Sequence, residues 1–173
     1  MRKTRSIVLT GLMIAIGLVI VTVLKNFGGQ QINIMFSPMH FPVMIAGLAI
    51  GPVEGLVAGV VTPILSYLIN GLPPQGPLAM ACELGTYGLV TGLLMKYLPL
   101  KGMAKVYGAL LVSMIAGRIV GGIVTGFILN AGSYSLELWI SSYFVATAPA
   151  IVVDLVLIPL IVRALQRAGL SVK

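Results

Sequence analysis

Long apolar stretches dominate the chain, and short polar or glycine- and proline-containing stretches separate them. We place six apolar stretches at residues 6–24, 38–50, 53–68, 78–98, 105–129 and 138–165. A helix that crosses the hydrocarbon core of a bilayer needs about 20 apolar residues, and the second stretch is shorter than this. We therefore predict an all-α integral membrane protein, with six transmembrane helices in a single domain over residues 1–173.

The connections between the predicted helices differ in kind. Residues 25–37 are polar and contain glycines, which predicts a loop. Gly51-Pro52 predicts the end of one helix and the start of the next. Glycine is common just after the end of a helix, and proline is common in the first turn of a helix. Residues 70–77 contain several prolines and predict a stiff loop. Residues 99–104 form a basic connection, and 130–137 predict a further loop.

Composition agrees with a bilayer as the solvent. The chain is 58% hydrophobic and 9% charged, whereas a soluble domain carries about 25% charged residues. A chain of this size has too little interior to bury so much apolar surface away from water. A soluble globular fold is therefore excluded, and the lipid bilayer becomes the first expected partner.

The basic residues indicate how the helices are oriented. Nine of the eleven lie in three clusters, at the two ends and in the connection near the middle: Arg2, Lys3, Arg5, Lys96, Lys101, Lys105, Arg163, Arg167 and Lys173. Positive charge near a helix end holds that end in the cytoplasm, so we predict both termini inside and an even number of spans. A five-span alternative, with the second and third stretches merged, puts the termini on opposite sides. Since the orientation of the helices in the membrane explains the clusters of basic residues, we reject nucleic acid as a partner.

Two ionisable residues fall at similar depth inside the predicted helices. Arg118 lies in the outer half of the fifth helix, and Glu83 about two turns into the fourth, with Tyr87 one turn deeper on the same face. Charges inside a bilayer need a partner or a cavity. Two interpretations stay open: Arg118 and Glu83 form one buried ion pair, or they line an outward-facing pocket for a polar ligand.

Other polar residues have simpler explanations. Asp154 fits a packed, hydrogen-bonded role in the sixth helix, and Glu54 complements the N-terminal dipole of the third. His40 anchors a loop or contacts a ligand. As the single histidine, and with Cys82 as the single cysteine, it has no partners for a metal site, so we predict neither metal nor cofactor.

The predicted outer loops carry amide and aromatic side chains, the usual lining of a site for a small polar organic molecule. Asn33, Gln75, Tyr134, Trp139 and Tyr143 are the candidates, although Trp139 also fits an interfacial aromatic belt. No catalytic motif and no phosphate-binding loop is present, so an enzyme is not expected.

Three blocks together resemble the substrate-binding (S) components of energy-coupling factor (ECF) transporters. They are MHFPVMIAG at 39–47 with GP at 51–52 and GLVAG at 55–59, ELGTYG at 83–88, and AGRIVGG at 116–122. The similarity covers nearly the whole chain, including its length, its six spans and their orientation. The blocks separate this family from membrane proteins in general, but they do not identify a ligand.

This resemblance implies a binding protein for a vitamin or vitamin precursor in a prokaryotic cell (plasma) membrane. Such a protein works with a membrane coupling (T) subunit and two cytoplasmic ATPase subunits, and ATP hydrolysis topples it to carry the ligand inward. The family's first helix meets the coupling subunit through a stripe of alanines, which here reads Gly11 and Ala15. The implied ligand site combines the first and third loops with the outer halves of the last three helices. The candidate residues are Asn33, His40, Gln75, Glu83, Tyr87, Arg118, Tyr134, Trp139 and Tyr143.

The choice of ligand depends on Arg118. A carboxylate ligand makes a bidentate contact with a guanidinium, which favours pantothenate. Pyridoxine or hydroxymethylpyrimidine suits Tyr87, Trp139 and His40 instead, and cobalamin needs a wider pocket. Outside this family, the alternatives are a self-sufficient secondary transporter, which the lack of an inverted repeat disfavours, and a membrane assembly factor.

Overall fold

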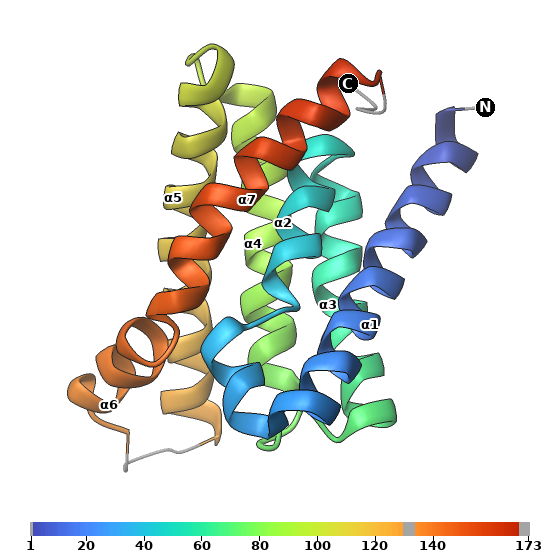
Figure 1. Cartoon of the computed structure of the whole chain (residues 1–173). Helices are drawn as coiled ribbons and strands as arrows, with labels where there is room; N and C mark the ends of the chain where they lie inside the picture. Colours follow the sequence, from blue (N-terminus) through green and yellow to red (C-terminus); the bar gives the residue numbers. More distant parts are fainter. Residues whose placement is uncertain (1, 130–133, 170–173) are drawn as a thin grey trace.

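The computed structural model describes residues 2–129 and 134–169, which form a bundle of helices without a strand in that part of the chain (Figure 1). Its elements are α1 (Arg2–Phe36), α2 (His40–Ala49), α3 (Pro52–Asn70), α4 (Leu78–Tyr97), α5 (Gly102–Ile123), the π-helical η1 (Val124–Leu129), α6 (Leu136–Ile140), the π-helical η2 (Ser141–Val145) and α7 (Ala148–Arg167).

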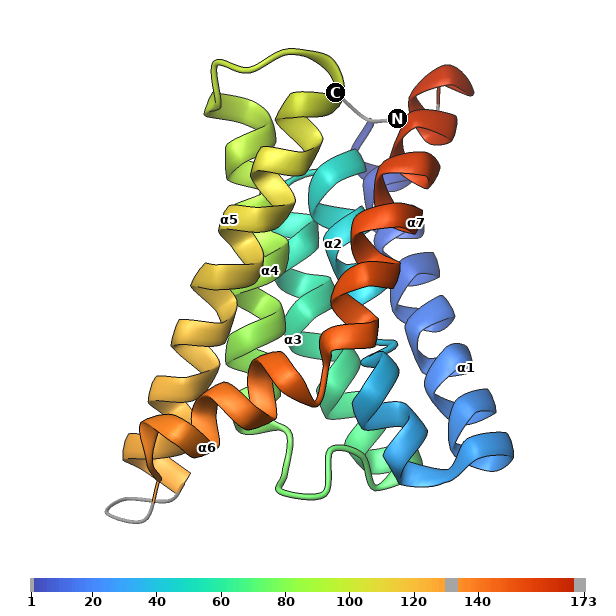
Figure 2. The same cartoon turned by 60° about the vertical axis from the view of Figure 1, so that its left-hand side comes forward.

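Five segments of the described chain are long and apolar enough to cross a membrane. They are Lys3–Phe36, Pro52–Asn70, Leu78–Tyr97, Gly102–Leu129 and Ala148–Arg167. The prediction of an all-α, multi-pass membrane protein is therefore confirmed. α2 has only ten residues, and nine of them are buried. A helix that is apolar on all sides belongs inside a bundle, and α2 indeed lies between the longer helices (Figures 1 and 2).

The described start of α1 and the end of α7 lie at one end of the bundle (Figure 1). There the Arg5 Nη2 donates a hydrogen bond to the Gly169 carbonyl oxygen at 2.9 Å. We call this the terminal end, and the opposite one the distal end. The connection between α4 and α5 also lies at the terminal end, whereas the loop between α3 and α4 lies at the distal end (Figure 2). Lys173, from the third basic cluster, falls outside the described residues.

The first predicted loop is wrong, because residues 25–37 are mostly helical. α1 continues to Phe36 and is interrupted at Gly29, with φ 71° and ψ −171°. A positive φ is accessible to glycine at little cost, so the chain bends at this one residue. The helix then resumes, and the Asn33 Nδ2 donates across the bend to the Gly29 carbonyl oxygen at 3.4 Å.

The sixth predicted helix, 138–165, is also wrong as a continuous element. It consists of α6, η2, a turn at 146–147 and α7, and α6 runs at an angle to α7 across the distal end (Figure 2). Pro149 lies in the first turn of α7, after Thr147 as its N-cap. Proline lacks the N–H that a continuous helix needs and is accommodated in a first turn. The predicted loop 130–137 includes residues 130–133, which lie outside the described residues.

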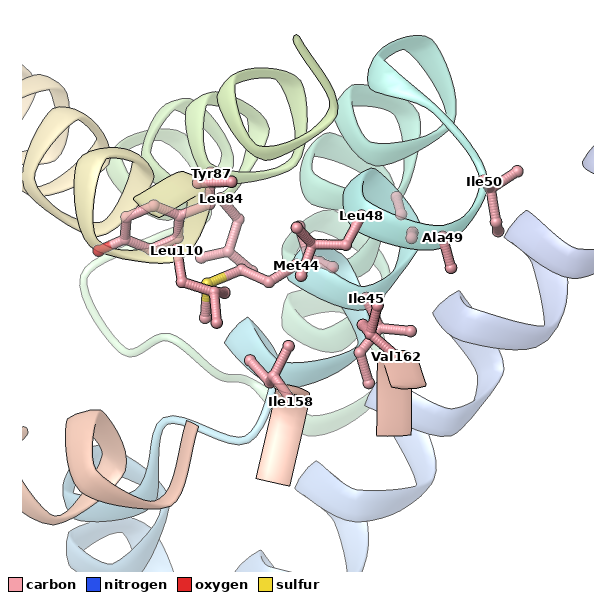
Figure 3. Packing of buried hydrophobic residues seen from close by; sticks show 14 of the residues in the cluster. Met44, Ile45, Leu48, Ala49, Ile50, Leu84, Tyr87, Leu110, Ile158 and Val162 are labelled. Atoms are coloured by element: carbon pink, nitrogen blue, oxygen red, sulfur yellow. The ribbon is translucent and has the colours of Figure 1, made fainter. Parts of the chain in front are cut away.

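Glycines bring α2, α3 and α4 into backbone contact. A Cβ on Gly55 would collide with the backbone of Gly88, and one on Gly59 with the Leu84 carbonyl group. Similarly, a Cβ on Gly47 would meet the Gly88 carbonyl oxygen. Small residues permit such close approach where lipid supplies no hydrophobic force between helices. The apolar core of the bundle includes Met44, Leu48, Leu84, Leu110, Ile158 and Val162, together with Tyr87 (Figure 3).

The contact between α1 and α3 is more polar. The Ser6 hydroxyl donates to the Glu54 Oε1 at 2.5 Å near the terminal end. Towards the distal end, Thr22 bonds Asn70 side chain to side chain at 3.0 Å, and the Lys25 Nζ donates to the Asn70 carbonyl oxygen at 2.6 Å. Glu54 lies in the first turn of α3, as predicted, and it also fixes α1 to that helix.

Candidate functional site

A cavity of about 310 Å³ lies at the distal end of the bundle. Its walls come from the second part of α1, the start of α2, the loop between α3 and α4, one face each of α4 and α5, and the segment before α7. The lining residues are Asn33, Ile34, Ser37, Pro38, Met39, His40, Leu72, Pro73, Pro74, Gln75, Met80, Glu83, Arg118, Ser142, Tyr143, Ala146 and Thr147. The volume is at the small end of the range for small-molecule sites, about 300–1,000 Å³.

Glu83 forms the acidic part of the lining. Its side chain is buried, and Oε1 accepts a hydrogen bond of 2.6 Å from the Tyr87 hydroxyl one helical turn deeper. The His40 Nε2 lies 3.6 Å from the same oxygen. The His40 Nδ1 lies 2.9 Å from the Ser37 carbonyl oxygen. Because a carbonyl only accepts, Nδ1 is assigned the hydrogen and Nε2 faces the carboxylate. With the hydrogen on Nδ1, the neutral ring has none on Nε2, so the hydrogen bond that holds Glu83 comes from the Tyr87 hydroxyl.

Arg118 supplies the basic part of the lining. It is only 5% exposed, and its Nε donates to the Tyr143 carbonyl oxygen at 2.7 Å, while Nη2 donates to the Thr147 Oγ1 at 3.3 Å. Its guanidinium carbon lies 5.2 Å from the centroid of the Phe144 ring, a cation–π contact. Nη1 has no hydrogen-bond partner among the described residues, so one edge of the guanidinium is available to an acceptor in the cavity.

Arg118 and Glu83 do not form an ion pair with each other. In residues 2–129 and 134–169, the basic side chain beside the Glu83 carboxylate is His40, with Nε2 at 3.6 Å, and Arg118 bonds the segment before α7 instead. Of the two interpretations left open by the sequence, the geometry favours a shared polar cavity. Glu83 and Arg118 offer it an acceptor and a donor that are both removed from water.

The structure brings six of the nine candidate ligand residues into the cavity wall. These are Asn33, His40, Gln75, Glu83, Arg118 and Tyr143. Tyr87 is fully buried beneath them and reaches the cavity only through Glu83. Asn33 enters the wall because α1 resumes as a helix after Gly29, a geometry that a flexible loop does not provide.

Tyr134 and Trp139 lie elsewhere, in a second hollow of about 480 Å³. This hollow is lined mainly by apolar residues of α5 and η1, including Ile119, Ile123 and Phe127. The Tyr134 hydroxyl has no hydrogen-bond partner among the described residues. Burial raises the pKa of this hydroxyl above its usual 10.0, and the charge of Glu83 adds to the shift.

Sequence reasoning missed Ser37, Ser142 and Thr147 as lining residues. Ser142 and Thr147 fall inside the predicted helix 138–165, from which only Trp139 and Tyr143 were chosen as candidates. Pro149 was the available signal, because a proline at this spacing is typical of a helix start just after Thr147.

Asp154 is buried on α7, as predicted, but it has no recorded hydrogen bond to the described residues and does not line the cavity. The described residues also contain no group of three or more His, Cys, Asp or Glu side chains placed to hold a metal ion. The cavity wall itself offers arginine, carboxylate, imidazole, amide and hydroxyl groups for charge and hydrogen-bond contacts.

Comparison with known proteins agrees with this architecture. The model of a family described as "ECF transporter, substrate-specific component" matches residues 5–172. No significant match was found among curated proteins or among solved structures. The family match covers almost the whole chain, including every element that contributes to the distal cavity.

Proposed function

This chain belongs to the substrate-specific components of ECF transporters, and we propose that it captures a vitamin or vitamin precursor outside the cell for delivery inward. Members of the family are transport subunits rather than enzymes. The observation that carries the proposal is the distal cavity, in which Arg118 and Glu83 are buried without neutralising each other. In this proposal a membrane coupling subunit and two cytoplasmic ATPase subunits supply the energy and topple the chain.

We further propose that the bundle crosses the membrane six times, with α2 and the residues around it as the short pass. Both termini then lie in the cytoplasm and the distal cavity faces outward. The terminal end supports this orientation, because the α4–α5 connection with Lys101, and the helix ends with Arg5 and Arg167, all lie there. Such an excess of positive charge marks the cytoplasmic side. The expected location is a prokaryotic plasma membrane.

Pantothenate is the ligand that we propose first. Its carboxylate suits the free edge of the Arg118 guanidinium, since arginine binds carboxylates in bidentate geometry. Its hydroxyl groups and amide can bond Glu83, Asn33 and Gln75, which also line the cavity. Pantothenate has a carboxylate at one end and hydroxyl groups at the other. These two ends match the Arg118 cation and the Glu83 carboxylate, which lie at separate places in the cavity wall.

A small neutral aromatic, pyridoxine or hydroxymethylpyrimidine, is the second candidate. His40 and Tyr143 in the cavity wall favour it. However, Tyr87 is covered by Glu83, and Trp139 belongs to the second hollow. Two of the three aromatic or imidazole side chains considered for stacking are therefore absent from the cavity, which supports the carboxylate ligand.

We propose the outer face of α1 as the surface for the coupling subunit. Gly11 and Ala15 are both exposed, and a Cβ on Gly11 would meet nothing within 4 Å. They follow each other at one helical turn, so a second helix can approach closely along this line. Leu12 and Val19 on the same helix are exposed apolar residues.

The test separates this function from its alternatives. Calorimetry on the purified chain compares the affinities for pantothenate, pyridoxine and hydroxymethylpyrimidine. Uptake of the ligand is then measured in vesicles that contain the chain with or without the ATPase module. We expect pantothenate to bind the chain alone and to enter vesicles only with the module. Uptake by the chain alone indicates a secondary transporter, and no binding of any of the three indicates an assembly factor or another vitamin as the ligand. Arg163→Ala, an exposed arginine on α7 near the terminal end, is the control for Arg118→Ala.

A further inference from the structure

One wall of the distal cavity is attached to the bundle through few side chains. We call residues 136–147 the closing segment; four of its residues line the cavity, namely Ser142, Tyr143, Ala146 and Thr147. The recorded hydrogen bonds from this segment to α5 and η1 converge on two residues, Arg118 and Thr125. Because so few residues attach this wall, its position depends on the side chains that orient Arg118 and Thr125.

Trp139 is the first of these groups, although it lies outside the cavity. Its indole Nε1 donates to the Arg118 carbonyl oxygen at 3.1 Å. The indole rests against Gly122, one turn further along α5, where a Cβ would collide with Nε1 and Cδ1. The missing side chain at Gly122 is therefore what lets Trp139 reach the backbone of Arg118.

Phe144 is the second. Its ring lies 5.2 Å from the guanidinium carbon of Arg118 and meets the Trp139 ring edge-on, at 5.4 Å and 80°. Neither aromatic residue lines the distal cavity. Trp139 thus bonds the backbone of Arg118, and Phe144 packs against its guanidinium. The guanidinium in turn bonds the closing segment at the Tyr143 carbonyl oxygen.

From this arrangement we infer that Trp139, seated on Gly122, and Phe144 are positioning residues that keep the closing segment shut over a bound ligand and set the rate at which the ligand leaves. They act through Arg118 and never touch the ligand. The inference concerns the same site and rests on the proposed binding function, but the closure itself can be measured without any ligand.

The first experiment measures closure directly. Met39 lines the cavity and is 6% exposed, so Met39→Cys in a Cys82→Ala background places a single buried thiol in the cavity that the closing segment helps to enclose. Labelling of the purified chain by a maleimide then reports how often the segment opens. We expect Trp139→Phe, which keeps a ring but loses the N–H, and Phe144→Leu each to raise the labelling rate about five-fold, the effect of one lost hydrogen bond or ring contact.

Phe127→Leu is the matched control. Phe127 is an aromatic residue of the neighbouring η1 that is 79% exposed, so its loss leaves the labelling rate unchanged. Gly122→Ala tests the contact between the Trp139 indole and Gly122. The new methyl group displaces the indole, and we expect the labelling rate to rise about five-fold in this variant by itself. In the Trp139→Phe background, the smaller ring leaves room for the new methyl group, and Gly122→Ala adds little. Fully additive effects of these two changes would contradict the seating of Trp139 on Gly122.

The second experiment measures dissociation of pantothenate from the same variants, with Cys82 and Met39 intact. We expect the off-rate to rise about five-fold in Trp139→Phe and in Phe144→Leu, and to stay unchanged in Phe127→Leu. Equal labelling rates and equal off-rates in all variants, at unchanged melting temperature, overturn the inference. If labelling responds but pantothenate does not bind, the ligand assignment fails and the inference stands. If pantothenate binds but labelling does not respond, the inference fails by itself.

Discussion

The two sides of the bundle are held together in different ways. On one side, α2, α3 and α4 touch backbone to backbone, because Gly47, Gly55 and Gly88 leave no room even for a methyl group. On the other, the segment before α7 meets α5 through hydrogen bonds and ring contacts centred on Arg118. Backbone contacts without side chains have few alternative arrangements, whereas a few polar contacts can break and reform. The first side is suited to a frame, and the second to a wall that opens.

The largest expected effect is on the frame. Gly55→Leu drives a side chain into the Gly88 backbone, and neither helix can shift without separating from α2. We expect the free energy of unfolding to fall by about 3 kcal/mol or more, together with poor yield. The measurement is thermal unfolding of the purified protein in detergent. Gly11→Leu is the matched control, since a Cβ there meets nothing within 4 Å; an equal loss in both variants would refute the backbone-contact explanation.

The next effect is on the wall. Arg118→Ala removes one of the two donors to the Tyr143 carbonyl oxygen, leaving the Thr147 hydroxyl, and it removes the cation from the cavity. We expect pantothenate binding to weaken by about 2–5 kcal/mol, whereas the melting temperature changes less than in Gly55→Leu. Calorimetry measures the affinity, with Arg163→Ala as the control. Unchanged affinity in Arg118→Ala would show that no ligand carboxylate meets this residue.

A smaller effect is expected beneath the cavity. Tyr87→Phe removes the hydroxyl that bonds the Glu83 Oε1, and leaves His40 as the neighbour of that oxygen. The loss of one hydrogen bond costs about 0.5–1.5 kcal/mol, and binding should weaken several-fold because Glu83 is less well oriented. Affinity and melting temperature of Tyr87→Phe are compared with those of Tyr97→Phe, at an exposed tyrosine of the same helix. Identical behaviour of the two variants would assign Tyr87 to packing alone.

The smallest effect on binding comes from Gly11, on the face that we assign to the coupling subunit. Gly11→Leu should bind pantothenate like the unchanged chain, because the residue is exposed and remote from the cavity. Uptake into vesicles with the ATPase module should fall strongly, since a bulky side chain prevents close approach of another helix. Lys3→Leu, an exposed change near the start of the same helix, is the control. Normal uptake in Gly11→Leu would exclude this face as the docking surface.

Much of the frame could be predicted from the sequence, and less of the wall. The apolar stretches predict α3, α4 and α5 well, and glycines at four-residue spacing such as Gly55 and Gly59 indicate close helix contact. Hydrophobic content does not distinguish a straight helix from a broken one, so the turn at Thr147 was missed. Similarly, Gly29 alone breaks α1, and the polar residues around it do not.

The candidate site shows the same division. Arg118 and Glu83 are conspicuous because charges are costly in a bilayer, and both line the cavity. Trp139 was attractive as an aromatic residue near the same end, but the direction of α6 places it on the far side of Arg118. That direction depends on a turn and a π-helical segment, which have no strong sequence pattern.

Mass spectrometry of the small molecules released from the detergent-purified chain identifies the ligand of the distal cavity directly. Arg118→Ala and Arg163→Ala are purified in parallel from the same cells, supplied with pantothenate. We expect a stoichiometric vitamin, pantothenate first, from the unchanged chain and from Arg163→Ala, and little or none from Arg118→Ala. No vitamin from the unchanged chain, or equal amounts from all three, would contradict this expectation.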